Sequence, residues 1–102
     1  MTAAEQETPR WAGPRLERGI ALLDRKHPGW ENEIDLDALD LSNVRYCVLG
    51  QVYGDFGDGL RQINEGLNWS SASQFGFMAW GRETYPRLTE KWRKIIERRR
   101  AA

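Results

Sequence analysis

The residues that could do chemistry in this chain are few and widely spaced. The chain has 102 residues, with one cysteine, Cys47, and one histidine, His27. Nucleophilic catalysis would need Cys47 activated by a base, but the cysteine stands in an apolar run and His27 precedes Pro28 at a predicted helix end. We therefore expect Cys47 to be buried and chemically quiet, and a serine hydroxyl in its place to be poorly satisfied.

Metal and phosphate chemistry have no supporting pattern either. One cysteine and one histidine do not make a zinc site. Asp55 and Asp58 stand among glycines in the segment 54–59, but this segment lacks the alternating carboxylates and distal glutamate of a calcium loop. It also lacks the Gly-Lys-Ser/Thr ending of a phosphate-binding loop. We expect no metal, no cofactor and no enzymatic activity.

The composition is that of an ordinary small soluble protein. Charged residues make up 29% and hydrophobic residues 40%, and the formal net charge is zero. A neutral chain has no overall attraction to nucleic acid or acidic lipid. There is no signal-peptide pattern and no apolar run of about 18 residues that could span a membrane. We expect a cytoplasmic protein with a flexible tail at 1–13 and one small domain at 14–102, without membrane association.

The zero net charge hides an asymmetry between two segments. Residues 24–58 carry eight acidic and three basic residues, whereas residues 83–102 carry seven basic and three acidic ones. The two segments either face each other in the fold, or the basic one meets an acidic partner or nucleic acid. In the second case Lys91, Lys94 and Arg98, which share one helix face, would contact phosphates.

A second candidate surface lies in residues 66–81, which contain no charge but several aromatic side chains. Most of the five tryptophans must pack inside so small a domain. Trp69, Phe77 and Trp80 are the candidates for aromatic residues that stay outside and bind a partner protein. The alternative is that all of them belong to the core.

Three segments position these residues. Gly13-Pro14 begins a helix predicted at 14–26, with apolar residues at helical spacing. The acidic segment 31–43 is predicted to be a connector whose aliphatic residues dock on the core. A final helix is predicted at 86–99, with Trp92 on its apolar stripe as a core residue that contacts the helix at 14–26.

The middle of the chain is ambiguous. Residues 45–53 suit a buried helix, capped by Ser42 or Asn43 with Val44, Val48 and Val52 on one face, or a buried strand. Of the two, the helix is favoured. Residues 54–59 are a turn by composition. The segment 51–63 is then a loose helix-turn-helix candidate, although Asp55 and Asp58 would place negative charge in the turn.

Several short patterns resemble a family of small uncharacterised proteins encoded by actinobacteria and their bacteriophages. They include Pro28-Gly-Trp30, Cys47-Val-Leu-Gly-Gln51, Tyr53-Gly-Asp-Phe56 and the Leu88-Thr-Glu-x-Trp92 of the last helix. The resemblance covers roughly residues 16–97. It implies a phage or prophage source and makes the Cys-Val-Leu-Gly-Gln block a determinant of the fold, but it brings no activity and no site residues.

These observations predict a mainly α protein, a small single-domain bundle of three to five helices with a flexible N-terminus. The predicted function is a non-enzymatic protein-interaction module, a phage or prophage accessory protein whose partner is a host or phage protein. The alternative is a small nucleic-acid-binding protein that uses its basic C-terminal helix.

Overall fold

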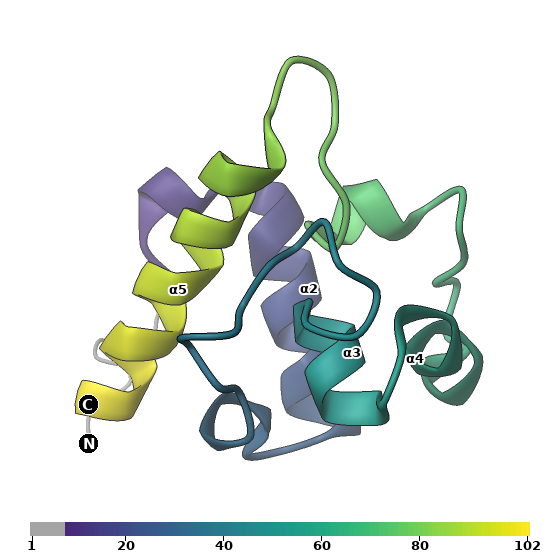
Figure 1. Ribbon diagram of the computed structural model, residues 1–102, viewed down its shortest axis with the longest axis horizontal. Helices are drawn as coiled ribbons and strands as arrows, with labels where there is room; N and C mark the ends of the chain where they lie inside the picture. The colour runs from purple at the N-terminus through teal and green to yellow at the C-terminus, as the bar shows by residue number, and fades with distance from the viewer. Residues whose placement is uncertain (1–7) are drawn as a thin grey trace.

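The computed structural model describes residues 8–102, which form four α-helices and no strand (Figure 1). The elements, in chain order, are the 3-10 helix η1 (Arg10–Ala12), α2 (Gly13–Lys26), the 3-10 helix η2 (Trp30–Asn32), α3 (Val48–Tyr53), α4 (Phe56–Ile63), the 3-10 helix η3 (Ala72–Phe75) and α5 (Tyr85–Ala101). The predicted mainly helical fold is confirmed. No helix among the described residues is long and apolar enough to cross a membrane.

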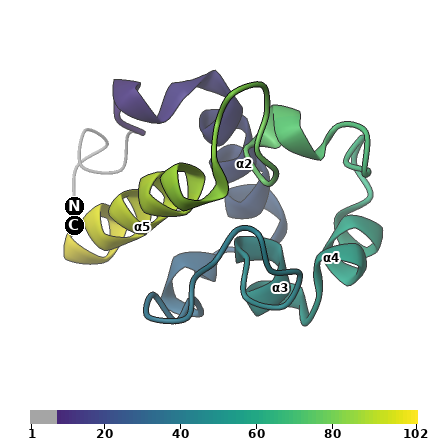
Figure 2. The same ribbon diagram turned by 45° about the horizontal axis from the view of Figure 1, so that its top comes forward.

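The two long helices match their predicted positions. Helix α2 begins at Gly13-Pro14 and ends at Lys26, and it buries Leu16, Ile20 and Leu23. Helix α5 begins after Thr84, whose side chain accepts a hydrogen bond from the Arg87 backbone N–H. In both views α5 and α4 lie on opposite sides of the molecule, with α2 and α3 between them (Figures 1 and 2).

Trp92 joins α5 to the rest of the core. Its ring stacks on Phe77, with 5.6 Å between centroids and 10° between planes, and meets Trp30 edge-on at 5.9 Å. Its indole N–H donates a 2.7 Å hydrogen bond to the carbonyl of Gly76. Gly76 in turn lies against Leu16, where an added Cβ would come within 2.8 Å of the leucine side chain. Trp92 therefore connects with α2 through Gly76.

The acidic connector docks on the core as predicted, and the basic helix holds it there. Ile34, Leu39 and Leu41 are buried. Arg99 pairs with Asp24 at 2.6 Å and Glu31 at 3.5 Å. Further hydrogen bonds run from Arg100 to the carbonyls of Glu31 and Ile34, and from Arg93 to that of Leu36. The acidic and basic segments thus face each other.

The middle of the chain is helical but shorter than predicted. Helix α3 begins at Val48, so the face shared by Val44, Val48 and Val52 was wrong, and its N-cap is Cys47 rather than Ser42 or Asn43. The Asn43 side chain instead accepts the backbone N–H of Arg45, which turns the chain before the helix. This turn brings the Val44 carbonyl so close to Gly50 that an added Cβ would stand 2.4 Å away.

Two other predicted boundaries also differ from those in the structure. The predicted turn at 54–59 is only Gly54 and Asp55, because the Asp55 side chain caps α4 by accepting the Asp58 backbone N–H at 3.0 Å. The predicted tail at 1–13 falls mostly on residues 1–7, which lie outside the described residues. Its last part is ordered, since Arg10–Ala12 form η1 and Ala12 is buried against the core.

Candidate functional site

Cys47 and His27, the residues that nucleophilic chemistry would use, both have structural partners. Cys47 is buried, as predicted, and its sulfur accepts the Gly50 N–H at 3.2 Å while lying 3.8 Å from the Val44 carbonyl. Burial raises the pKa of its thiol. The Nε2 atom of His27 is 2.5 Å from a Glu33 carboxylate oxygen. Residues 8–102 contain no cluster of three His, Cys, Asp or Glu side chains that could hold a metal.

The aromatic stretch divides into outside and inside residues. Trp69 is 61% exposed and Trp80 is 66% exposed. Phe77 is only 2% exposed, so the prediction that it stays outside was wrong. Gly76, with φ of 74°, reverses the chain and directs Phe77 inward, where its ring lies parallel to both Phe75 and Trp92.

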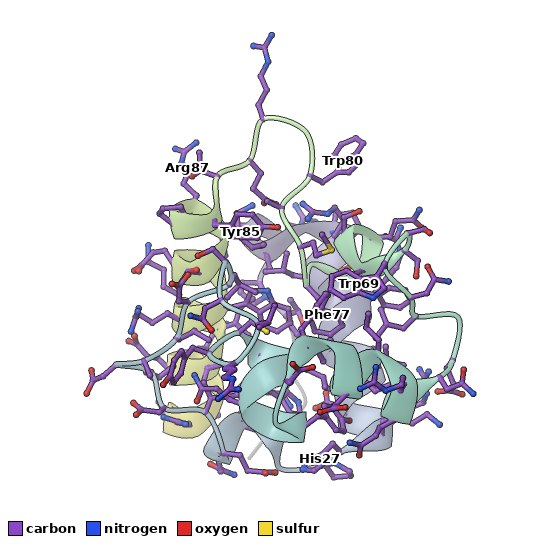
Figure 3. All side chains as sticks on the ribbon, turned by 45° about the vertical axis from the view of Figure 1, so that its right-hand side comes forward. His27, Trp69, Phe77, Trp80, Tyr85 and Arg87 are labelled. Atoms are coloured by element: carbon purple, nitrogen blue, oxygen red, sulfur yellow. The ribbon has the colours of Figure 1, made fainter. Side chains whose placement is uncertain are left out.

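Trp69 stands at the edge of an apolar crevice of about 80 Å³. Val44, which is 49% exposed, lines the same crevice. The other lining residues come from the connector, the N-cap of α3, α4, the aromatic stretch and the first residue of α5: Leu41, Ser42, Asn43, Cys47, Phe56, Phe77, Met78 and Tyr85. Trp69 meets Phe56 edge-on at 4.8 Å, and Figure 3 shows it beside Phe77. We call this feature the Val44–Trp69 crevice.

A fixed carboxylate neighbours the crevice. Asp40 accepts hydrogen bonds from Ser42, a crevice residue, through its backbone N–H at 3.0 Å and its hydroxyl at 2.6 Å. These bonds favour the charged form and lower the pKa of the Asp40 carboxyl. A carboxylate whose charged form is favoured is therefore bonded to one of the residues that line the crevice.

Trp80 lies elsewhere, on the loop before α5 (Figure 3). It lines a separate hollow of about 300 Å³ with Arg15, Arg18, Ser73 and Gln74. Both arginines are engaged: Arg15 donates to the carbonyls of Ser73 and Met78, and Arg18 donates to that of Gln74. These bonds hold residues 73–78 against α2, so the polar groups of this hollow serve the fold.

The cations of α5 form two sets. Arg93, Arg99 and Arg100 face the connector and are used in the contacts described above. The second set recurs every three or four residues along another face and consists of Arg87, Lys91, Lys94 and Arg98. Lys91 comes within only 3.8 Å of Glu83, and the other three form no ion pair with a described residue.

Arg87, Lys91 and Lys94, from that second set, line a groove of about 760 Å³. Its lining is completed by Trp11, Arg82, Glu83 and Glu90, and we call it the Trp11 groove. Arg98 lies beyond it. Trp11 is 46% exposed. Because 1–13 was predicted to be a tail, Trp11 was missed. A tryptophan next to the Gly13-Pro14 helix start was the available signal.

The helix-turn-helix candidate has the predicted elements but not the chemistry of a DNA reader. Helices α3 and α4 are joined by two residues, yet α4 turns Phe56, Leu60 and Ile63 into the core. Its one cation, Arg61, pairs with Asp58. A recognition helix needs several free side chains that reach base edges, and α4 does not present them.

No protein-family model, no curated protein and no solved structure matches this chain. The resemblance to small proteins of actinobacteria and their phages therefore stays a prediction.

Proposed function

We propose that this protein is a non-enzymatic interaction module that binds another protein through the Val44–Trp69 crevice. The observation that carries the proposal is the pairing of two exposed apolar side chains, Val44 and Trp69, over a hollow whose floor is the core. Single exposed apolar residues are ordinary, but a contiguous apolar feature with a concave centre is typical of a binding surface.

The size of the crevice suits one apolar side chain of a partner. At about 80 Å³ it is larger than the roughly 30 Å³ occupied by one water molecule, and its lining is mainly aliphatic and aromatic. Interfaces gain most of their affinity from a few apolar or aromatic residues inserted into such hollows. The carboxylate of Asp40 favours a partner segment with a basic residue next to the inserted one.

The resemblance to proteins of actinobacteria and their phages suggests where to find the partner. We propose that it is a host or phage protein and that this chain is a phage or prophage accessory factor. Such a factor needs no catalytic group, which agrees with the structural use of Cys47 and His27.

Two substitutions in the crevice and one matched control outside it test the assignment. The protein and its Val44→Asp, Trp69→Ser and Trp80→Ser variants are immobilised, exposed to actinobacterial lysate, and compared by quantitative mass spectrometry. A partner should be captured by the wild type and by Trp80→Ser, and lost with Val44→Asp and Trp69→Ser. Circular dichroism of each variant checks that the fold is kept.

The two tryptophan variants remove the same side chain at similar exposure, so they differ only in location. A partner lost with Trp80→Ser but kept by both crevice variants would overturn the crevice assignment. A concentration-dependent dimer that the crevice variants abolish would identify a second copy of this chain as the occupant.

A further inference from the structure

Two free cations near the start of α5, Arg82 and Arg87, occupy positions that the helix dipole does not favour. Arg87 lies in the first turn of α5, and Arg82 lies just before the helix. The helix dipole is positive at this end, so it stabilises anions here and disfavours cations. Neither arginine pairs with a carboxylate of a described residue. Local charges that oppose the helix dipole without structural compensation are typical of binding sites.

The carboxylates of the Trp11 groove do not cancel these charges. Glu83 is already held by Arg15, which lies 3.0 Å away and does not line the groove. Glu90 pairs with Arg93 at 3.4 Å, and Arg93 also lies outside the lining. The groove therefore keeps three cations without an ion pair, Arg82, Arg87 and Lys94, and a fourth, Lys91, which shares Glu83 with Arg15 at a distance of 3.8 Å.

We propose that the Trp11 groove binds single-stranded nucleic acid, with a base stacked on Trp11 and the backbone phosphates held by the four cations. Arg87, Lys91 and Lys94 follow one another along about 10 Å of the helix, which provides a track of positive charge rather than a single point. An exposed indole beside such a track is the combination that single-strand binding proteins use.

Two other polyanions fit less well. A DNA duplex is read by an element that protrudes into its groove, whereas these cations line a hollow. An acidic peptide would neutralise the cations, but unlike a nucleic acid it does not carry a planar aromatic group at every unit that could stack on Trp11. The neutral net charge of the chain also means that affinity must come from this local site and not from a general positive field.

The first experiment measures binding of the full chain to fluorescein-labelled oligothymidylate of about 20 nucleotides by fluorescence anisotropy. Three or four phosphate contacts on a single strand predict a slope of log K against log salt of about −2 to −3. Affinity should then fall about 20- to 50-fold between roughly 50 and 200 mM salt. A matched oligouridylate shows whether RNA is bound more tightly than DNA, and either preference agrees with the proposal.

Two substitutions separate the phosphate and base contacts. Lys94→Glu should lower affinity at least about ten-fold and make the salt slope shallower by about one. Arg45→Glu is its control, because Arg45 is exposed, lies outside the groove and changes the net charge equally. Trp11→Ala should lower affinity about 5- to 150-fold while leaving the salt slope unchanged, and Trp11→Tyr should restore most of it.

Several results would overturn the proposal. They are absence of binding at low salt, equal losses with Lys94→Glu and Arg45→Glu, full affinity in Trp11→Ala, and equal affinity for a duplex. Competition by polyglutamate as effective as that by the oligonucleotide would indicate an acidic protein partner instead. The crevice variant Trp69→Ser should bind normally, so failure here and failure of the crevice hypothesis are distinguishable.

Discussion

Replacing Trp92 tests the packing that holds α5 to the molecule. Its fully buried ring contacts Phe77 and Trp30, and its N–H bonds to the Gly76 carbonyl at 2.7 Å. We expect the ring and its hydrogen bond to make separable contributions to the free energy of unfolding. Trp92→Phe keeps an aromatic ring but removes the hydrogen-bond donor, and Trp92→Ala removes both the ring and the donor.

The magnitudes follow from these contacts. An orphaned buried carbonyl costs about 1–3 kcal/mol, which is the expected loss for Trp92→Phe. Truncating a buried tryptophan to alanine costs about 3–5 kcal/mol. A domain of this size has a free energy of unfolding of about 5–15 kcal/mol, so Trp92→Ala removes a large part of it. Each 1 kcal/mol lowers the melting temperature by about 4–8 °C.

The assay is urea denaturation followed by far-ultraviolet circular dichroism, with the free energy of unfolding compared at constant m-value. Trp80→Ala is the control, because that exposed side chain should matter by less than about 0.5 kcal/mol. If Trp92→Ala unfolds within about 1 kcal/mol of the wild type, the ring is not a core residue. If Trp92→Phe matches the wild type, the Gly76 hydrogen bond does not contribute.

Three further predictions concern stability. Gly19→Ala should destabilise the protein by about 1–3 kcal/mol although alanine favours helices, because its Cβ would stand 2.1 Å from the Phe75 carbonyl oxygen. Thermal melting shows whether the melting temperature falls, as expected, or rises. Cys47→Ser should lower the free energy of unfolding by under about 1 kcal/mol, less than Cys47→Ala, because the Gly50 N–H and the Val44 carbonyl can satisfy the hydroxyl as at an ordinary N-cap. This reverses the expectation from the sequence. Urea titration of both variants ranks the two losses. The free energy of unfolding should fall both when the pH is raised and when it is lowered, for two different reasons. The raised pKa of Cys47 gives stability that is complete below its ordinary value of 9.0 and lost as pH rises, a loss that Cys47→Ala reduces. The lowered pKa of Asp40 gives stability that is present above 3.8 and lost as pH falls, which Ser42→Ala reduces.

The long helices could be predicted because their signals are local. Pro14 starts α2, and the recurrence of Leu88, Trp92 and Ile95 fixes the buried face of α5. Both patterns extend over three or more turns, so no tertiary contact is needed to recognise them. The docking of aliphatic connector residues such as Ile34 was also predicted, from their placement between acidic residues in the segment 31–43.

The predictions that were wrong concern residues whose positions are set by single backbone turns. Phe77 is buried because Gly76 adopts a positive φ and turns the chain inward. The uncharged, aromatic composition of residues 66–81 does not indicate which aromatic residue such a turn directs into the core. Helix α3 starts later than predicted because the Asn43 side chain accepts the N–H of Arg45 in a turn, and Cys47 caps the helix instead.

The basic helix illustrates why charge counting alone left two interpretations open. The first interpretation is confirmed, because Arg93, Arg99 and Arg100 contact the acidic segment, and the second remains our proposal for the other face of α5. Arg99 contacts Asp24, Glu31 and the face of Trp30, with its guanidinium 5.4 Å from the ring centroid, so its loss would loosen the connector. Lys94 has no such partner among the described residues, and its loss should leave the fold intact. This division is what makes charge reversal at Lys94 a test of binding rather than of folding.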